Sequence, residues 1–163
     1  MTKRALATLL ALLGLQVHAE DHATAKADCE AVMNVALPFA EEMLQKHGEF
    51  FPFGATMNGK GEISHIGGHD GREHPPSADI IKLLKDGFRE GAKKGELKAT
   101  ALVYDVRVIL PGGGEKSDAV AVSLNHLANY SVVVFFPYRI EGGEVVFGET
   151  FAQQGEADVF ASK

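Results

Sequence analysis

The sequence contains a single cysteine, Cys29, so no disulfide bond can form within one chain. It also lacks a basic cluster: 16 Lys and Arg residues are outnumbered by 22 Asp and Glu residues, for a net charge of −6. We therefore expect no nucleic-acid partner. The apolar run at residues 5–15 is too short for a membrane-spanning helix, which needs about 20 residues, so we expect no membrane insertion.

Motifs that would identify a reaction are also missing. The sequence has no G-x-S-x-G, P-loop, Cys-x-x-Cys or HExxH pattern. Enzymatic activity is therefore not predicted, although a hydrolase with a site carried on a loop remains an alternative.

The N-terminus has the pattern of a secretory signal peptide. Lys3 and Arg4 precede the apolar run, and Val17 and Ala19 stand at the −3 and −1 positions of a cut after Ala19. We expect a signal peptide at residues 1–19, secretion to a bacterial periplasm, and one mature domain at residues 20–163. Cleavage removes two basic residues and no acidic ones, which changes the net charge from −6 to −8.

Two stretches of the mature chain have the pattern of helices. The first covers residues 24–47, and Pro38 within it predicts a break, because proline has no N–H and clashes with the preceding turn. The second begins with Ser77 as its N-cap and ends before Gly95, with Lys85 on its solvent side. The expected buried faces consist of Val32, Val35, Phe39 and Met43 on the first helix, and Ile80, Ile81, Leu84 and Phe88 on the second.

The rest of the mature chain alternates between strand patterns and turns. A hairpin around the turn Asn58–Gly61 precedes the second helix, and a four-strand meander follows it. We therefore predict an α+β fold: an antiparallel sheet of about five to six strands with helices packed on one face. The expected strands are residues 50–57, 62–67, 98–110, 119–125, 130–140 and 144–152.

The segments "HGEFFPFGA", "SDAVAV" and "FFPYRI", in that order, resemble those of a group of small secreted bacterial α+β proteins of uncharacterised function. The G-E-F-x-P-F-G pattern is the core of the resemblance, which spans most of residues 30–155. It implies a shared fold, and no site residue is carried over.

The stretch "HIGGHDGREH" is rich in residues that can bind metals. A loop can ligate zinc through His65, His69, Asp70 and His74, with a position left open for substrate. Gly67 and Gly68 disfavour a helix there, and the spacing matches no zinc motif. We expect a polar loop whose imidazoles do not converge, with zinc binding as the alternative.

The mature N-terminus offers a second metal site. A cut after Ala19 would leave Glu20-Asp21-His22, in which the free amine, two backbone amides and the imidazole suit the square-planar preference of Cu(II) or Ni(II). We expect no cofactor, with copper as the alternative, and the copper site does not depend on the fold.

Together, these features predict a small secreted binding protein, such as a partner-neutralising or immunity-like protein. Its partner would be a protein or a small molecule. A metal-binding protein and a loop-site hydrolase are the two alternatives.

Overall fold

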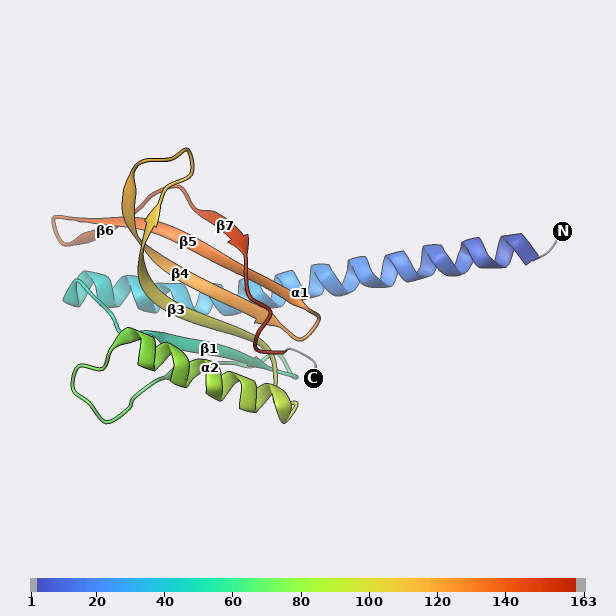
Figure 1. The fold of residues 1–163 in the computed structure, drawn as a ribbon, viewed down its shortest axis with the longest axis horizontal. Coiled ribbons are helices and arrows are strands. Elements are labelled where there is room, and N and C mark those ends of the chain that lie inside the picture. Colours follow the sequence, from blue (N-terminus) through green and yellow to red (C-terminus); the bar gives the residue numbers. More distant parts are fainter. Residues whose placement is uncertain (1–2, 161–163) are drawn as a thin grey trace.

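The computed structural model describes the backbone of residues 3–160 and the side chains of residues 20–160. Within that part of the chain, two helices and a seven-stranded antiparallel sheet form one α+β fold, which confirms the predicted class (Figure 1). The elements are α1 (Lys3–His47), β1 (Phe53–Asn58), β2 (Ile63–Gly67), α2 (Ser77–Lys93), β3 (Leu97–Ile109), β4 (Lys116–His126), β5 (Tyr130–Glu141), β6 (Glu144–Phe147) and β7 (Phe151–Gln154).

The side chains of the expected signal peptide, residues 1–19, lie outside the described residues, and its first two residues lie outside the described backbone as well. Its cleavage stays a prediction. None of the helical residues that the structure describes forms a segment long and apolar enough to cross a membrane.

The sheet has the strand order β2-β1-β3-β4-β5-β6, and β7 also pairs with β5. α2 connects β2 to β3, which lies on the other side of β1, so β1 and β3 are neighbours although a helix separates them in the chain. Short loops join the adjacent strands from β3 to β6, whereas β6 and β7 follow one another along the same side of β5. β2 therefore forms one edge of the sheet.

The strand expected at residues 144–152 is interrupted. β6 pairs with Tyr138–Glu141, whereas β7 pairs with Val132–Phe135. The interruption lies opposite Pro137, which has no N–H to donate to a neighbouring strand. Gly148 instead donates its N–H to the Pro137 carbonyl at 2.7 Å, and the chain crosses there from one short strand to the other.

The two helices lie on opposite faces of the sheet, and not on one face as expected. In β3, Ala101 and Val103 pack in the core beneath α1, whereas Leu102 between them packs against Ile80 and Phe88 of α2. Successive side chains of a strand point to opposite faces. Because both faces of this part of β3 are apolar, each face is buried by a different helix.

α1 continues through Pro38 without the expected break. Its buried side is also displaced from the expected one: Val35 and Phe39 are 39% and 41% exposed. The side chains that face the sheet are mostly small, which allows the helix to approach it closely. They are Ala25, Cys29, Val32, Ala36, Ala40 and Leu44.

α2 begins at Ser77, with Pro76 rather than Ser77 in the N-cap position. Ile80, Leu84 and Phe88 are buried as expected, and Ile81 packs beside them half-buried. The ring of Phe88 lies directly over Gly54 in β1, where a Cβ atom would come within 2.5 Å of it.

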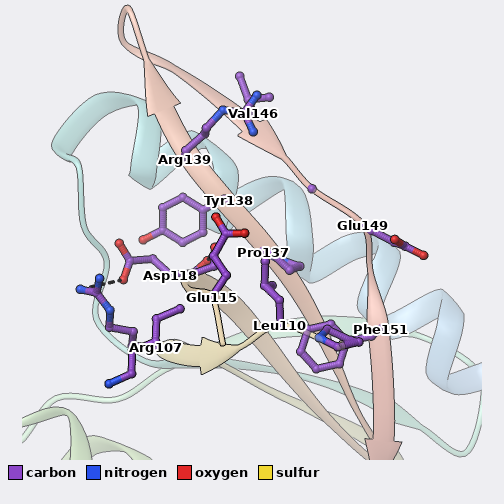
Figure 2. Close-up of a pocket in the computed structure, with 14 residues that line it drawn as sticks. Arg107, Leu110, Glu115, Asp118, Pro137, Tyr138, Arg139, Val146, Glu149 and Phe151 are labelled. Atoms are coloured by element: carbon purple, nitrogen blue, oxygen red, sulfur yellow. Dashed lines mark hydrogen bonds and ion pairs between the residues drawn. The ribbon is translucent and has the colours of Figure 1, made fainter. Parts of the chain in front are cut away.

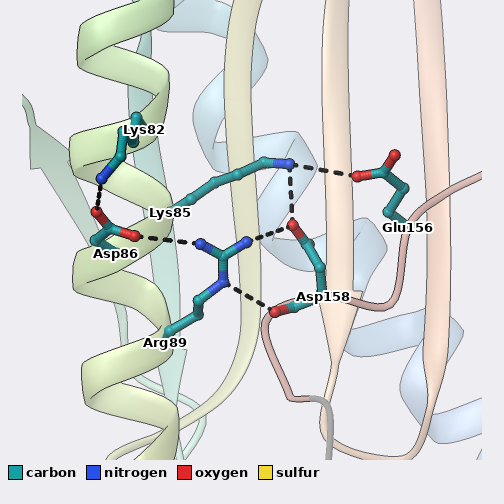
Figure 3. A network of polar contacts seen from close by, with 6 residues as sticks. All are labelled: Lys82, Lys85, Asp86, Arg89, Glu156 and Asp158. Carbon is teal, nitrogen blue, oxygen red and sulfur yellow. Dashed lines mark hydrogen bonds and ion pairs between the residues drawn. The ribbon is translucent and has the colours of Figure 1, made fainter.

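The C-terminal segment after β7 is fastened to α2 by a polar network (Figure 3). Asp158 Oδ2 lies 3.0 Å from Lys85 Nζ and 2.7 Å from Arg89 Nη2, and the Asp158 carbonyl accepts from Arg89 Nε at 3.1 Å. Lys85 therefore binds the C-terminal segment, instead of pointing to solvent as expected. Beside this network, Val159 is buried against the apolar side of α2.

Candidate functional site

A cleft of about 560 Å³ lies where the β3–β4 hairpin meets β5, β6 and the start of β7 (Figure 2). Its lining combines three kinds of side chain. Basic groups come from Arg107, Lys116 and Arg139, acidic groups from Glu115, Asp118 and Glu149, and apolar surface from Leu110, Pro111, Pro137, Val146 and Phe151.

The hairpin at the rim of the cleft is shaped by its glycines. Gly112, Gly113 and Gly114 all have φ between 87° and 97°, a conformation that other residues rarely adopt. Leu110 and Glu115 close the loop through a backbone hydrogen bond of 2.9 Å. The loop was expected from the sequence, but its position above a cleft was not.

Polar side chains on adjacent strands meet beside the cleft. Arg107, Asp118 and Tyr138 lie opposite one another on β3, β4 and β5. Tyr138 donates its hydroxyl hydrogen to Asp105 Oδ1 at 3.1 Å, and Arg107 Nη1 lies 3.9 Å from Asp118 Oδ1. Arg139 pairs instead with Glu141 on its own strand.

Partial burial alters the acidity of two of these groups. It raises the pKa of the Asp105 carboxyl, although the Tyr138 hydroxyl acts in the opposite direction. Burial also raises the pKa of Tyr138, and the neighbouring charge of Asp105 raises it further. Tyr138 thus remains a hydrogen-bond donor over the physiological pH range.

The structure places the histidines of the "HIGGHDGREH" stretch in different surroundings. The ring of His65 in β2 lies 5.9 Å from that of Phe39, whereas the ring of His74 lies 6.5 Å from that of Phe51. His69 lies in the loop after β2. Within residues 20–160, no group of three or more His, Cys, Asp or Glu side chains is arranged to hold a metal ion.

Asp70, the fourth residue considered for zinc, is engaged with Arg72. Its Oδ2 accepts from Arg72 Nε at 2.8 Å, and its Oδ1 accepts from the Arg72 backbone N–H at 3.0 Å. The hydrogen bond from the Arg72 side chain lowers the pKa of the Asp70 carboxyl. Arg72 also reaches Asp79 in the first turn of α2, so this contact orders the loop that precedes the helix.

Glu20, Asp21 and His22 are exposed on α1. The His22 ring meets the ring of Tyr130 edge-on, with 5.1 Å between the centroids. The copper site considered for these residues requires a free amine at Glu20, which only cleavage after Ala19 would create. This site stays a prediction.

Sequence reasoning missed a partly buried polar cluster between α1 and the sheet. Asp28 Oδ2 lies 3.0 Å from Lys98 Nζ and 3.2 Å from His126 Nε2, and His126 is 6% exposed. The Ala128 backbone N–H donates to His126 Nδ1 at 3.0 Å, so Nε2 carries the hydrogen and donates to Asp28. Both ring nitrogens are thus occupied, which assigns His126 a structural role. No spacing in the sequence links these three residues.

No protein-family model, curated protein or solved structure shows significant similarity to this chain. The resemblance based on the G-E-F-x-P-F-G segment therefore stays a prediction.

Proposed function

We propose that the protein is a secreted, periplasmic binding module, and that its cleft takes a small ligand bearing both a carboxylate and an amine. Short peptides are the ligand class with this chemistry. The observation that carries the proposal is the cleft of about 560 Å³, whose wall combines basic, acidic and apolar side chains from separate strands. Its volume falls within the range of about 300–1,000 Å³ that is usual for small-ligand sites.

The basic groups suit a ligand carboxylate. Arg107 is 69% exposed, and its contact with Asp118 is long, at 3.9 Å, so its guanidinium can take a further partner. A guanidinium binds a carboxylate with two parallel hydrogen bonds. Arg139 on β5 lines the same cleft.

The acidic and apolar groups suit the rest of a peptide. Glu115 and Glu149 line the same cleft and can pair with an ammonium group. Between these charges, Leu110, Pro137 and Phe151 provide apolar surface for a side chain. Opposite charges on one wall select a ligand that carries both signs, because a ligand of one sign would meet like charges.

The test is a calorimetric titration of the mature protein with tripeptides such as Ala-Leu-Ala, beside the same peptides blocked at both ends. We expect the free peptide to bind and the blocked peptide to bind at least about 10-fold more weakly, a difference of about 1.4 kcal/mol. Arg107→Ala should weaken binding similarly, whereas Lys46→Ala, on α1 away from the cleft, should not. Equal binding of free and blocked peptides would contradict the proposal.

A second candidate function is binding of Cu(II) or Ni(II) at the mature N-terminus. It is favoured by the exposure of Glu20, Asp21 and His22, which leaves these residues accessible once a free amine exists. Metal binding there would unwind the first turn of the mature helix, because the two backbone amides must lie in one plane with the imidazole.

A Cu(II) titration of the mature protein should produce a visible d–d band that His22→Ala abolishes. A variant with one residue added before Glu20 should also lose the band, because the imidazole would no longer be third in the chain. Undiminished binding by both variants, or a mature N-terminus at another residue, would eliminate this site.

A further inference from the structure

Apolar side chains are exposed on both faces of the sheet beside the edge strand β2. On the α1 face, Phe39 is 41% exposed and its ring lies 5.9 Å from that of His65. On the α2 face, Ile66 and Leu83 are 37% and 45% exposed and line the same groove of about 340 Å³. Exposed apolar groups on both sides of a strand edge are what a second sheet would cover.

The backbone of β2 has hydrogen-bonding groups that point away from the sheet. Asn58 N donates to Glu62 O at 3.0 Å, so this pair is hydrogen-bonded, and such pairs alternate along antiparallel strands. Ser64 and Ile66 therefore bond to β1, whereas the N–H and C=O groups of Ile63, His65 and Gly67 point outward.

β2 has none of the usual features that prevent pairing at an edge. It contains no proline and no charged residue, and its register with β1 runs without a bulge. Within residues 3–160, no other strand pairs with this edge. The occupant that such an edge accepts is another extended strand.

We infer that β2 of a second copy of this chain pairs here, antiparallel, about a two-fold axis at His65. Each outward group then meets its counterpart: His65 pairs with the His65 of the second copy, and Ile63 with Gly67, which gives about six backbone hydrogen bonds. The exposed side chains of Phe39, Ile66 and Leu83 are brought toward those of the other copy.

Charge favours a second copy in this orientation. The protein is acidic overall, with a net charge of −6, so most of its surface repels another copy. The edge itself is uncharged from Ile63 to Gly67. Antiparallel pairing also directs Lys60 of one copy toward the loop of the other that contains Asp70, Arg72 and Glu73, which together carry a net charge of −1. Glu62 in the same turn accepts a hydrogen bond from Asn58 Nδ2 of its own copy at 2.6 Å.

The first test measures the oligomeric state of the mature protein by sedimentation equilibrium. We expect a dimer, and we expect Ile66→Lys to weaken it at least about 10-fold because it places a charge on the paired edge. The matched control is Ile109→Lys, since Ile109 is an exposed isoleucine of β3, 60% exposed, away from this edge. Circular dichroism confirms that each variant is folded. A monomeric parent, or equal weakening by both substitutions, would overturn the inference.

The second test measures the register. Only residue 65 faces its own counterpart, at a Cα distance of about 5.5 Å, which suits a disulfide bond. Under mild oxidation, His65→Cys should cross-link two copies efficiently, whereas Ile63→Cys and Gly67→Cys should cross-link poorly. Cys29 is 1% exposed and does not compete. Cross-linking that is equal at all three positions would overturn the two-fold pairing. The inference is independent of the peptide cleft, which lies near the other edge of the sheet.

Discussion

At the scale of single residues, Cys29 shows how a polar group is accommodated in this core. Its side chain is 1% exposed in the row of small residues through which α1 meets the sheet. Burial raises the pKa of the thiol from 9.0 to about 12, and the charges of Asp28 and Glu30 act in the same direction. The thiol is therefore protonated and inaccessible in the folded protein, which argues against a reactive or bridging role.

The raised pKa of Cys29 has a consequence for stability at high pH. Below pH 9 the thiol is protonated in both states, whereas between pH 9 and about 12 only the unfolded chain releases its proton. Ionisation then favours unfolding, so the thiol lowers the free energy of unfolding by up to about 1.4 kcal/mol per pH unit in that window.

Urea unfolding of the parent and of Cys29→Ala between pH 8 and pH 11 would test this prediction. The stability of the parent should fall more steeply above pH 9, because the alanine variant lacks the titrating group. Both proteins contain the same lysines and tyrosines, so the effect of their ionisation on stability cancels in the comparison. If the free energies of unfolding of the two proteins fell in parallel with pH, the thiol would not contribute to the loss of stability.

At the scale of elements, strand patterns were predicted more closely than helix packing. Alternating apolar residues located β3, and apolar runs bounded by turns located β4 and β5. The buried side expected for α1 included Val35 and Phe39 because they are large and apolar. The residues that contact the sheet instead include the small residues Ala36 and Ala40. Hydrophobicity alone does not distinguish a small residue that lets the helix approach the sheet closely from a small residue that makes no contact with the sheet.

Pro38 illustrates how tertiary packing overrides a local preference. The helix continues through it because Ala36 and Ala40 are both buried against the sheet and hold the backbone on either side. The cost of the missing hydrogen bond and of the ring's clash with the preceding turn remains in the folded state. Pro38 itself is exposed, so its removal would leave no cavity.

Pro38→Ala should therefore raise the free energy of unfolding by about 1–3 kcal/mol. Urea denaturation would measure the change. Gln45→Ala is a suitable control on the same helix, because Gln45 is exposed and its replacement should change stability by less than about 0.5 kcal/mol. A loss of stability in Pro38→Ala would instead indicate that the helix needs the local bend of proline to follow the sheet.

The site was less predictable than the elements for a related reason. Arg107 and Arg139 line one cleft only because β3 and β5 flank β4, and because the chain passes from β6 to β7 at Gly148. The sequence indicates the strands but not the interruption opposite Pro137 that forms this wall. Similarly, Asp28 and His126 are 98 residues apart, and only the packing of α1 on the sheet brings them together.

At the scale of the whole molecule, the C-terminal segment completes the face of the sheet that α2 covers only in part. Val159 fills the core beside Leu84 and Phe88, and Asp158 holds the segment through Lys85 and Arg89. The carboxylate of Asp158 is 25% exposed, so its ion pairs are only partly screened by water.

Asp158→Ala should lower the free energy of unfolding by about 1–3 kcal/mol, since two basic groups lose their shared partner. Glu144→Ala, at an exposed position of β6, should have an effect below about 0.5 kcal/mol. Thermal denaturation of the two variants beside the parent would measure both effects. An equal shift in the two variants would show that the network of Figure 3 contributes little to stability.

The order of the strands also sets the order in which amide hydrogens exchange with solvent deuterium. β3 lies between β1 and β4 and is covered by α1 on one face and α2 on the other, so its amides exchange only when much of the fold opens. In the part of the chain that the structure describes, the short strands β6 and β7 each hold four residues and pair with β5 alone. In a time course followed by NMR, protection should disappear first at these margins and last in the strand that lies beneath both helices.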